Sequence, residues 1–199
     1  PIYSIYLSDK LVGNRAVMQV NDCRTFLQKK NFIEQNICSE FPALTSECSE
    51  QIASSDLIIY SSGTQYSSLY PTFATKNLSA AIQQASALKV MVTNILPDNE
   101  TPNFRAIDSI NQACFYLNQK GMLDLEAKDL VDCLLVNEPA QSRSQHIRPG
   151  RLELENLDIS KVVIDKRFEK KGAAIEAGKH NPSFLSKTIY QMFESETTR

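Results

Sequence analysis

Three short apolar segments constrain what this chain can fold into more than any other feature of the sequence. Residues 56–60, 89–94 and 131–137 are largely apolar over consecutive positions rather than alternate ones. Such runs are typical of strands that are covered on both faces, as in parallel sheets. Residues 74–87 and 103–121 separate these runs and carry apolar side chains at helical spacing. The alternation predicts an α/β fold, with a Rossmann-like, mainly parallel sheet and helices on both faces.

Outside this unit the sequence predicts shorter elements. Asn181 and Pro182 combine a capping residue with a first-turn proline, and they predict a helix that runs through Met192. Residues 138–150 are polar and contain prolines and a glycine, which is typical of a mobile loop. The other expected elements are strands at 2–7, 15–20, 152–157 and 161–164, a helix that ends near residue 30, a helix at 49–54, and a loop at 36–50.

The chain length sets the domain organisation that we expect. With 199 residues and a mass of 22.4 kDa, the chain is long enough for one domain with a sizeable core. We predict a single α/β domain over residues 1–199, with residues 138–180 as a small, irregular α+β appendage. Because a strand pattern begins at Ile2, directly after Pro1, we also expect the chain to be part of a longer protein.

Composition argues against several classes of partner. The formal net charge of −2 leaves no broad basic surface for a nucleic-acid backbone. No apolar run in the sequence approaches the ~20 residues that a membrane-spanning helix needs. The cysteines are odd in number and form no C-x-x-C pair, so neither a disulfide framework nor a zinc site is expected. These features predict a cytoplasmic protein with reduced cysteines at positions 23, 38, 48, 114 and 133.

Residues 61–68, called the serine loop below, follow the first apolar strand and precede a helix. In open α/β sheets, ligands bind beyond the carboxyl ends of the strands. A glycine allows a tight turn there, and the free peptide N–H groups of a helix start favour an anion. The predicted phosphate- or nucleotide-binding residues are Ser61, Ser62, Gly63, Thr64, Tyr66, Ser67 and Ser68, with Asn94 and Asn137 at the other two strand ends. The alternative is a serine-rich surface turn in which one serine caps the helix.

The common phosphate and nucleophile motifs do not occur in the sequence. The pattern G-x-x-x-x-G-K-[ST] is missing, which excludes a P-loop. G-x-G-x-x-G is missing as well, so a dinucleotide fold of the dehydrogenase kind is unsupported. Without G-x-S-x-G, the nucleophile elbow of α/β-hydrolases is excluded.

The serine loop resembles a loop of the family that joins 2-phospho-L-lactate transferases (CofD-like) to gluconeogenesis factors (YvcK-like). The family pattern is an acidic residue, an apolar strand and then G-P-G-S/T-x-x-T/S-S-I/L-x-P. Here residues 56–71 read D-L-I-I-Y-S-S-G-T-Q-Y-S-S-L-Y-P. Further matches occur in order along most of the chain, at Val12-Gly13-Asn14, Ile82, Asn94, Glu100-Thr101, Asp108, Val136-Asn137-Glu138-Pro139 and His180-Asn181-Pro182.

The resemblance implies a nucleotide-linked ligand, such as a UDP-sugar, and two candidate functions. One is a phosphate- or nucleotide-sugar-binding domain without catalysis by this chain alone. The other is a transferase that moves a phospho-lactyl-like group from a nucleotide donor to an acceptor. Ser61 and Ser62 stand where the family has glycine and proline, and nothing before Pro1 supplies the family's early glycine-rich, acidic segment. These departures favour the binding domain and leave a structural domain with an inactive site as a third alternative.

Acidic residues near the second strand end give a candidate metal site. Asp98, Glu100 and Asp108 could place Mg²⁺ on a diphosphate, and the alternative is a solvated acidic loop. The expected partners are a nucleotide-linked small molecule and a second copy of the chain in a homodimer. Nucleic acid and membrane are not expected partners.

Isolated basic residues are weaker candidates. Lys76 and Arg105 could pair with phosphate or could face solvent, as most surface cations do. By the resemblance, His180 could touch the ligand, whereas its position alone suggests a neighbour of a helix cap. Residues 143–148 carry Arg143, His146 and Arg148, and we expect this small basic segment to be solvated.

Overall fold

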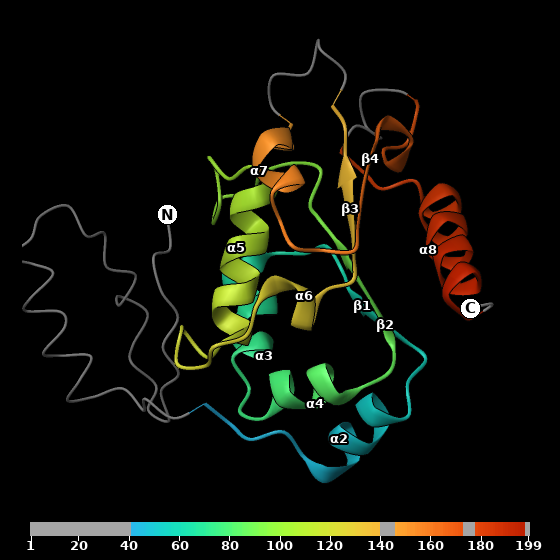
Figure 1. Cartoon of the computed structure of the whole chain (residues 1–199). Coiled ribbons are helices and arrows are strands. Elements are labelled where there is room, and N and C mark those ends of the chain that lie inside the picture. The colour runs from blue at the N-terminus through green and yellow to red at the C-terminus, as the bar shows by residue number, and fades with distance from the viewer. Residues whose placement is uncertain (1–40, 140–145, 173–177, 198–199) are drawn as a thin grey trace, which may run out of the picture.

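A four-stranded sheet forms the centre of the computed structural model, which describes residues 41–139, 146–172 and 178–197 (Figure 1). The strands, in spatial order, are β1 (Leu57–Tyr60), β2 (Leu88–Val92), β3 (Cys133–Asn137) and β4 (Lys161–Asp165). Each strand pairs in parallel with the next, so each connection crosses back along the sheet. The predicted α/β class with a parallel sheet is confirmed.

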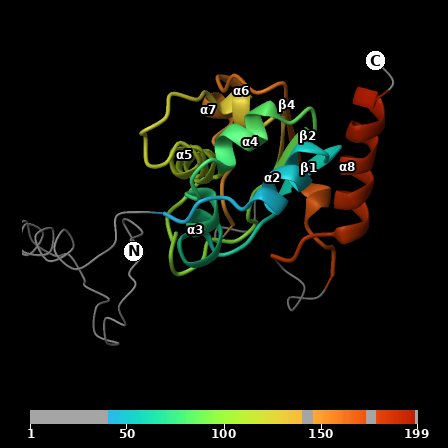
Figure 2. The same ribbon diagram turned by 90° about the horizontal axis from the view of Figure 1, so that it is seen from below.

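The helices form a layer on each face of this sheet. They are α2 (Ser46–Ala53), the π-helical turn η1 (Gln65–Leu69), α3 (Tyr70–Phe73), α4 (Leu78–Gln84), α5 (Ala106–Leu117), α6 (Ala127–Leu130), α7 (Arg151–Glu155), the 3-10 turn η2 (Lys166–Phe168) and α8 (Pro182–Thr197). Figures 1 and 2 show α5 and α7 on one side of the sheet and α8 on the other.

Two apolar layers hold these helices to the strands. In the larger layer, Ile110 and Leu117 of α5 pack with Leu134 of β3, and all three side chains are fully buried. In the smaller layer, Leu135 of β3 packs with Met192 of α8. Successive residues of β3 therefore enter opposite cores, which explains why its apolar run is continuous.

The predicted start of α8 is confirmed by its local geometry, whereas α5 ends at Leu117 and not at the predicted Gly121. At the start of α8, Oδ1 of Asn181 accepts a hydrogen bond from the N–H of Phe184 at 3.2 Å, and Pro182 is the first helical residue. After α5, the chain turns through positive φ angles at Gln119, Lys120 and Gly121. A left-handed backbone of this kind cannot continue an α-helix.

The strand predicted at 152–157 is wrong, because this segment contains α7. Leu152 and Leu154 alternate with charged residues, and that spacing suggested a half-buried strand. In the helix the two leucines point in different directions: Leu154 is fully buried, whereas Leu152 is 75% exposed. Leu154 is the buried residue of α7 and packs into the same core layer as α5.

Two other boundaries also differ from the prediction. The helix expected at 74–87 is replaced by α4 and by helical turns that begin at Gln65, inside the serine loop, because Asn77 has a left-handed backbone (φ 67) that separates α3 from α4. The loop expected at 36–50 is wrong from Ser46, where α2 begins. There, the Thr45 hydroxyl accepts a hydrogen bond from the N–H of Cys48 at 3.3 Å and caps the helix.

Some predicted elements lie outside the described residues, namely the strands at 2–7 and 15–20, the helix that ends near residue 30, and residues 140–145 of the loop at 138–150. The strand predicted at 161–164 is confirmed as β4, and it pairs with the full length of β3 in the main sheet. Within the described ranges, no helix combines the length and apolar character that crossing a membrane requires.

Leu134 and Leu152 differ in burial and therefore give a matched test of stability. Leu134→Ala should lower the free energy of unfolding by about 2–5 kcal/mol, because it removes a fully buried side chain from the central strand. Leu152→Ala should change it by less than about 0.5 kcal/mol, because Leu152 is exposed. Urea unfolding of both variants measures the difference, and equal losses would contradict the observed packing.

Candidate functional site

The carboxyl edge of the sheet brings the serine loop, Asn94 and Asn137 together. Val92 of β2 pairs with Leu135 of β3, so Asn94 and Asn137 each lie two residues beyond a paired position. The two amides thus stand at the same level of adjacent strands. The serine loop leaves β1 at the same edge, next to the end of β2. Its contacts are dominated by hydrogen bonds to segments that are distant in sequence.

Asn94 fastens the serine loop to the end of β2. Its Oδ1 accepts a hydrogen bond from the N–H of Gly63 at 2.9 Å, and its Nδ2 donates to the carbonyl oxygen of Gly63, also at 2.9 Å. The amide thereby reproduces a pair of strand hydrogen bonds beyond the end of β1. Since its donor and acceptor are both used, Asn94 positions the loop in this arrangement.

The Glu100 carboxylate occupies the start of the helical part of the serine loop. Its Oε2 accepts hydrogen bonds from the N–H groups of Tyr66 at 2.8 Å and Ser67 at 3.2 Å. Asp98 holds the backbone around Glu100, because its Oδ1 accepts from the N–H groups of Glu100 and Thr101, each at 2.9 Å. Two adjacent peptide donors that meet at one oxygen form a site for an oxyanion. Here the protein itself provides that oxyanion.

The hydroxyl groups of the serine loop lie in different environments. Ser61, Ser67 and Ser68 are exposed at the surface. The hydroxyls of Thr64 and Ser68 lie 2.7 Å apart and share a hydrogen bond. These side chains can therefore exchange their present contacts for contacts with a ligand at little cost in buried area.

Tyr66 is placed in the core rather than at the surface. Its ring packs edge-on against those of Tyr70 and Tyr116, with centroid distances of 5.0 and 6.1 Å, and the residue is 6% exposed. Burial raises the pKa of the Tyr66 hydroxyl to about 12, so the group stays neutral. The Tyr66 ring anchors the serine loop while its backbone N–H faces Glu100.

His180 connects the serine loop to β2. Its Nε2 lies 3.1 Å from the carbonyl oxygen of Thr93, and its Nδ1 lies 3.4 Å from the Ser62 hydroxyl. Because a carbonyl can only accept, the proton sits on Nε2, and Nδ1 accepts from Ser62. Burial lowers the pKa of His180, and the hydrogen bond to Thr93 only partly opposes this. The neutral ring is therefore the form that holds the loop.

Asn137 contrasts with Asn94. It is 4% exposed, and neither its Oδ1 nor its Nδ2 has a hydrogen-bond partner among the described residues. A buried amide without partners costs free energy, which a bound group or water would recover. Asn137 is thus the strand-end amide whose donor and acceptor groups both lack a hydrogen-bond partner among the described residues.

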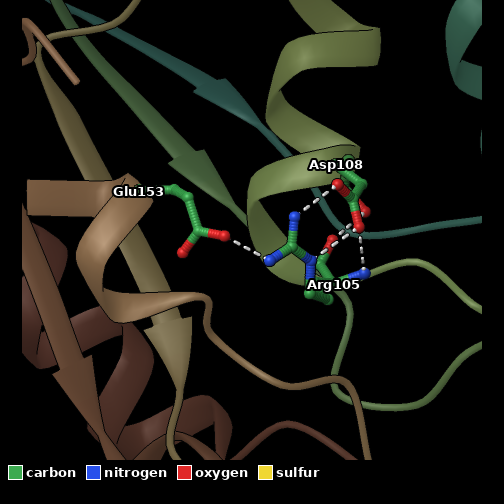
Figure 3. A network of polar contacts seen from close by, with 4 residues as sticks. Arg105, Asp108 and Glu153 are labelled. Atoms are coloured by element: carbon green, nitrogen blue, oxygen red, sulfur yellow. Dashed lines mark hydrogen bonds and ion pairs between the residues drawn. The ribbon is translucent and has the colours of Figure 1, made fainter. Parts of the chain in front are cut away.

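The three predicted metal ligands do not form one cluster. Glu100 binds the serine loop, Asp98 binds its own segment, and Asp108 pairs with Arg105 through Nε at 3.1 Å and Nη2 at 3.2 Å (Figure 3). Burial acts to raise the pKa of Asp108, but the hydrogen bonds from Arg105 outweigh it and the pKa is lowered. In the part of the chain that the structure describes, no group of three or more His, Cys, Asp or Glu side chains could hold a metal ion.

The other two predicted phosphate partners, Arg105 and Lys76, have contacts with segments outside the serine loop. Arg105 is engaged by Asp108 and by Glu153 of α7, as Figure 3 shows. The backbone of Lys76 pairs with Pro42 and Leu44, before α2. No local pattern predicts the contact that does organise the loop, because Glu100 and Tyr66 are 34 positions apart.

Comparisons with known proteins agree with this architecture. The family model described as 2-phospho-L-lactate transferase CofD matches residues 11–179. A curated relative from Aquifex aeolicus (strain VF5), named "Putative gluconeogenesis factor", is 30% identical over 166 residues, which are 78% of this chain and 47% of that protein. The chain therefore spans about half the length of the curated relative that it matches.

Solved structures share the fold of this chain. Two crystal structures of protein BH3568 from Bacillus halodurans, one described as a member of the UPF0052 family, superpose with a TM-score of 0.59 and 24% identity. Each superposition covers 74% of this chain, and 47% and 46% of the solved chains. Because the family match extends over most of the sequence and includes the serine loop, this chain belongs to the CofD/YvcK-like family.

Proposed function

We propose that this chain is the phosphate- or nucleotide-sugar-binding domain of a CofD/YvcK-like protein, without catalysis by this chain alone. The observation that carries the proposal is the convergence of the Tyr66 and Ser67 N–H groups on one carboxylate oxygen of Glu100. A phosphate oxygen accepts hydrogen bonds from peptide donors in the same way. A ligand phosphate would take the place of the Glu100 carboxylate at these two donors.

The neighbouring strand ends supply contacts for the rest of such a ligand. The unpaired amide of Asn137 can both donate and accept hydrogen bonds, which suits the hydroxyls of a sugar or the edge of a base. The exposed hydroxyls of Ser61 and Ser67 can join the phosphate contacts. An anion site together with an amide that can both donate and accept hydrogen bonds supports a nucleotide-linked ligand over free phosphate.

The description of the family, 2-phospho-L-lactate transferase, favours a transferase as the second candidate function. Such an enzyme works by positioning and charge stabilisation, and peptide donors at the serine loop could contribute both. Incubation of a nucleotide-linked phospho-lactyl donor and a hydroxyl-bearing acceptor with the chain and Mg²⁺ separates the two functions. Ion-exchange chromatography measures the release of free nucleotide over time. Steady release would favour the transferase over the binding domain.

Removing the Glu100 carboxylate tests the exchange of anions directly. Glu100→Ala should tighten UDP-glucose binding by about tenfold, roughly 1.4 kcal/mol, because the competing internal anion is gone. Glu155→Ala, which removes an exposed glutamate on α7, is the matched control and should leave the affinity unchanged. Isothermal titration calorimetry measures both, and an unchanged or weaker affinity in Glu100→Ala would exclude phosphate at this position.

Asn94 gives a second test, of loop positioning. Asn94→Ala removes both hydrogen bonds to Gly63 and should lower the free energy of unfolding by about 1–3 kcal/mol. It should also weaken UDP-glucose binding, because the peptide donors of the loop are then no longer held in place. Asn99→Ala, at an exposed site nearby, is the control for both measurements. Full binding by Asn94→Ala would mean that the ligand does not use this loop.

The neutral form of His180 predicts a pH dependence. Its pKa in the folded chain lies below the ordinary value of about 6.5, so the folded state resists protonation more than the unfolded state does. Stability from the neutral ring is therefore present above about pH 6.5, and it is lost as the pH falls through the lowered pKa. UDP-glucose binding should weaken from about pH 7.5 to about pH 5.5.

A histidine replacement identifies the responsible group. The sequence contains two histidines, His146 and His180, so each can be removed in turn. The pH dependence of UDP-glucose binding should flatten in His180→Gln and persist in His146→Gln. Persistence in His180→Gln would assign the effect to another group.

A further inference from the structure

A cleft of about 500 Å³ lies between residues 96–105, which follow β2, and residues 146–148, which precede α7. Two backbone hydrogen bonds hold these segments together: the N–H of Ile147 donates to Ile95 at 3.0 Å, and the N–H of Ala106 donates to Arg148 at 2.9 Å. The cleft is therefore fixed by main-chain contacts at both ends. Its volume is within the range that small-molecule sites occupy.

The lining of the cleft combines apolar walls with positive charge. Leu96, Phe104 and Ile147 contribute apolar surface, while Arg105 and Arg148 contribute guanidinium groups. The described lining residues include no aspartate or glutamate. This combination suits a ligand with an apolar body and a negatively charged group.

The two arginines of the cleft differ in what they can offer. Arg105 is already paired with Asp108 and with Glu153, a network that also ties α7 to the start of α5 (Figure 3). Arg148 is exposed, and the structure gives its guanidinium no carboxylate partner among the described residues. Arg148 is thus the cation that can bind an incoming carboxylate or phosphate.

His146 adds a buried polar atom to the wall of the cleft. Its Nε2 lies 2.9 Å from Oε1 of Glu169, an oxygen that also accepts from the N–H of Gly178 at 2.8 Å. Because a carboxylate can only accept, Nε2 carries a proton in this contact. The other ring nitrogen, Nδ1, is buried without a hydrogen-bond partner among the described residues. A hydroxyl group, which can both donate and accept, would recover the cost of burying this nitrogen by pairing with it.

From these observations we propose that the cleft binds a second ligand, a small organic anion with an apolar body and a hydroxyl group. The anionic group pairs with Arg148, the apolar body lies against Phe104 and Ile147, and the hydroxyl forms a hydrogen bond with Nδ1 of His146. The site goes beyond the proposed function, because none of these contacts involves the serine loop. Residues 96–105 carry both Glu100 and the cleft wall, so the two ligands would lie on either side of one segment.

Titration of the chain with 3-hydroxybenzoate, which has the three features of this ligand, tests the proposal by ¹H–¹⁵N NMR. Saturable shifts are expected at residues 96–105 and 146–148. Benzoate should bind several-fold more weakly because it lacks the hydroxyl, and phenol should bind more weakly still because it lacks the charge. Equal affinities for 3-hydroxybenzoate and benzoate would overturn the role of His146. Shifts centred on residues 61–68 would overturn the separate site.

Two surface variants keep the test independent of folding. Arg148→Ala should weaken 3-hydroxybenzoate at least tenfold, and Asn103→Asp, which adds a negative charge to the exposed wall without changing its shape, should weaken it several-fold. Arg151→Ala, at an exposed arginine paired with Glu138 outside the cleft, is the matched control. Affinity that is unchanged in both Arg148→Ala and Asn103→Asp would refute the proposal. Since no nucleotide is present, this result is separate from the fate of the serine-loop proposal.

Discussion

The contact between the Glu100 carboxylate and two peptide N–H groups of the serine loop is the interaction on which the arrangement of the site depends. Buried or half-buried peptide donors must be paired, and the first turn of a helix has no partners of its own for them. Glu100 satisfies the donors of Tyr66 and Ser67, while Asp98 holds the backbone of Glu100 in place. In the proposed function, a ligand phosphate takes the place of this side chain at the same two donors. The order of the serine loop therefore depends on an anion, at present the Glu100 carboxylate, at these two N–H groups.

The rest of the site is assembled by side chains that extend the sheet beyond its last hydrogen-bonded residues. Asn94 continues the pairing of β1 with β2 through its amide, and His180 links Thr93 to Ser62. His180 stands just before α8, whose apolar face is packed against β2 and β3 on the opposite side from α5. The position of the ring thus depends on a helix that takes no direct part in the site. The packing of α8 against the sheet thus helps to fix the positions of His180 and Ser62 at the sheet edge.

The parts that the sequence predicted are those governed by local patterns. Consecutive apolar residues identified β1, β2 and β3, and the Asn181-Pro182 pair identified the start of α8. The alternating leucines of α7 led to the wrong prediction of a strand, because alternation alone does not show that only Leu154 reaches the core. The density of hydroxyl groups located the serine loop, yet it did not reveal that the Tyr66 ring belongs to the core. The contact of Glu100 depends on tertiary packing, for which no local signal exists.

The two serines that depart from the family's glycine and proline bear on whether this loop is functional. An inactive site under no constraint would be expected to lose specific polar contacts. Ser62 instead provides a hydroxyl, which proline lacks, and that hydroxyl is within hydrogen-bonding distance of His180. Gly63, which follows, keeps both backbone groups bonded to Asn94. Ser62 therefore lacks the rigidity of a proline ring but gains a hydrogen bond to His180, which is distant in sequence. A loop held in this way retains its donors in a fixed arrangement, as binding an anion requires.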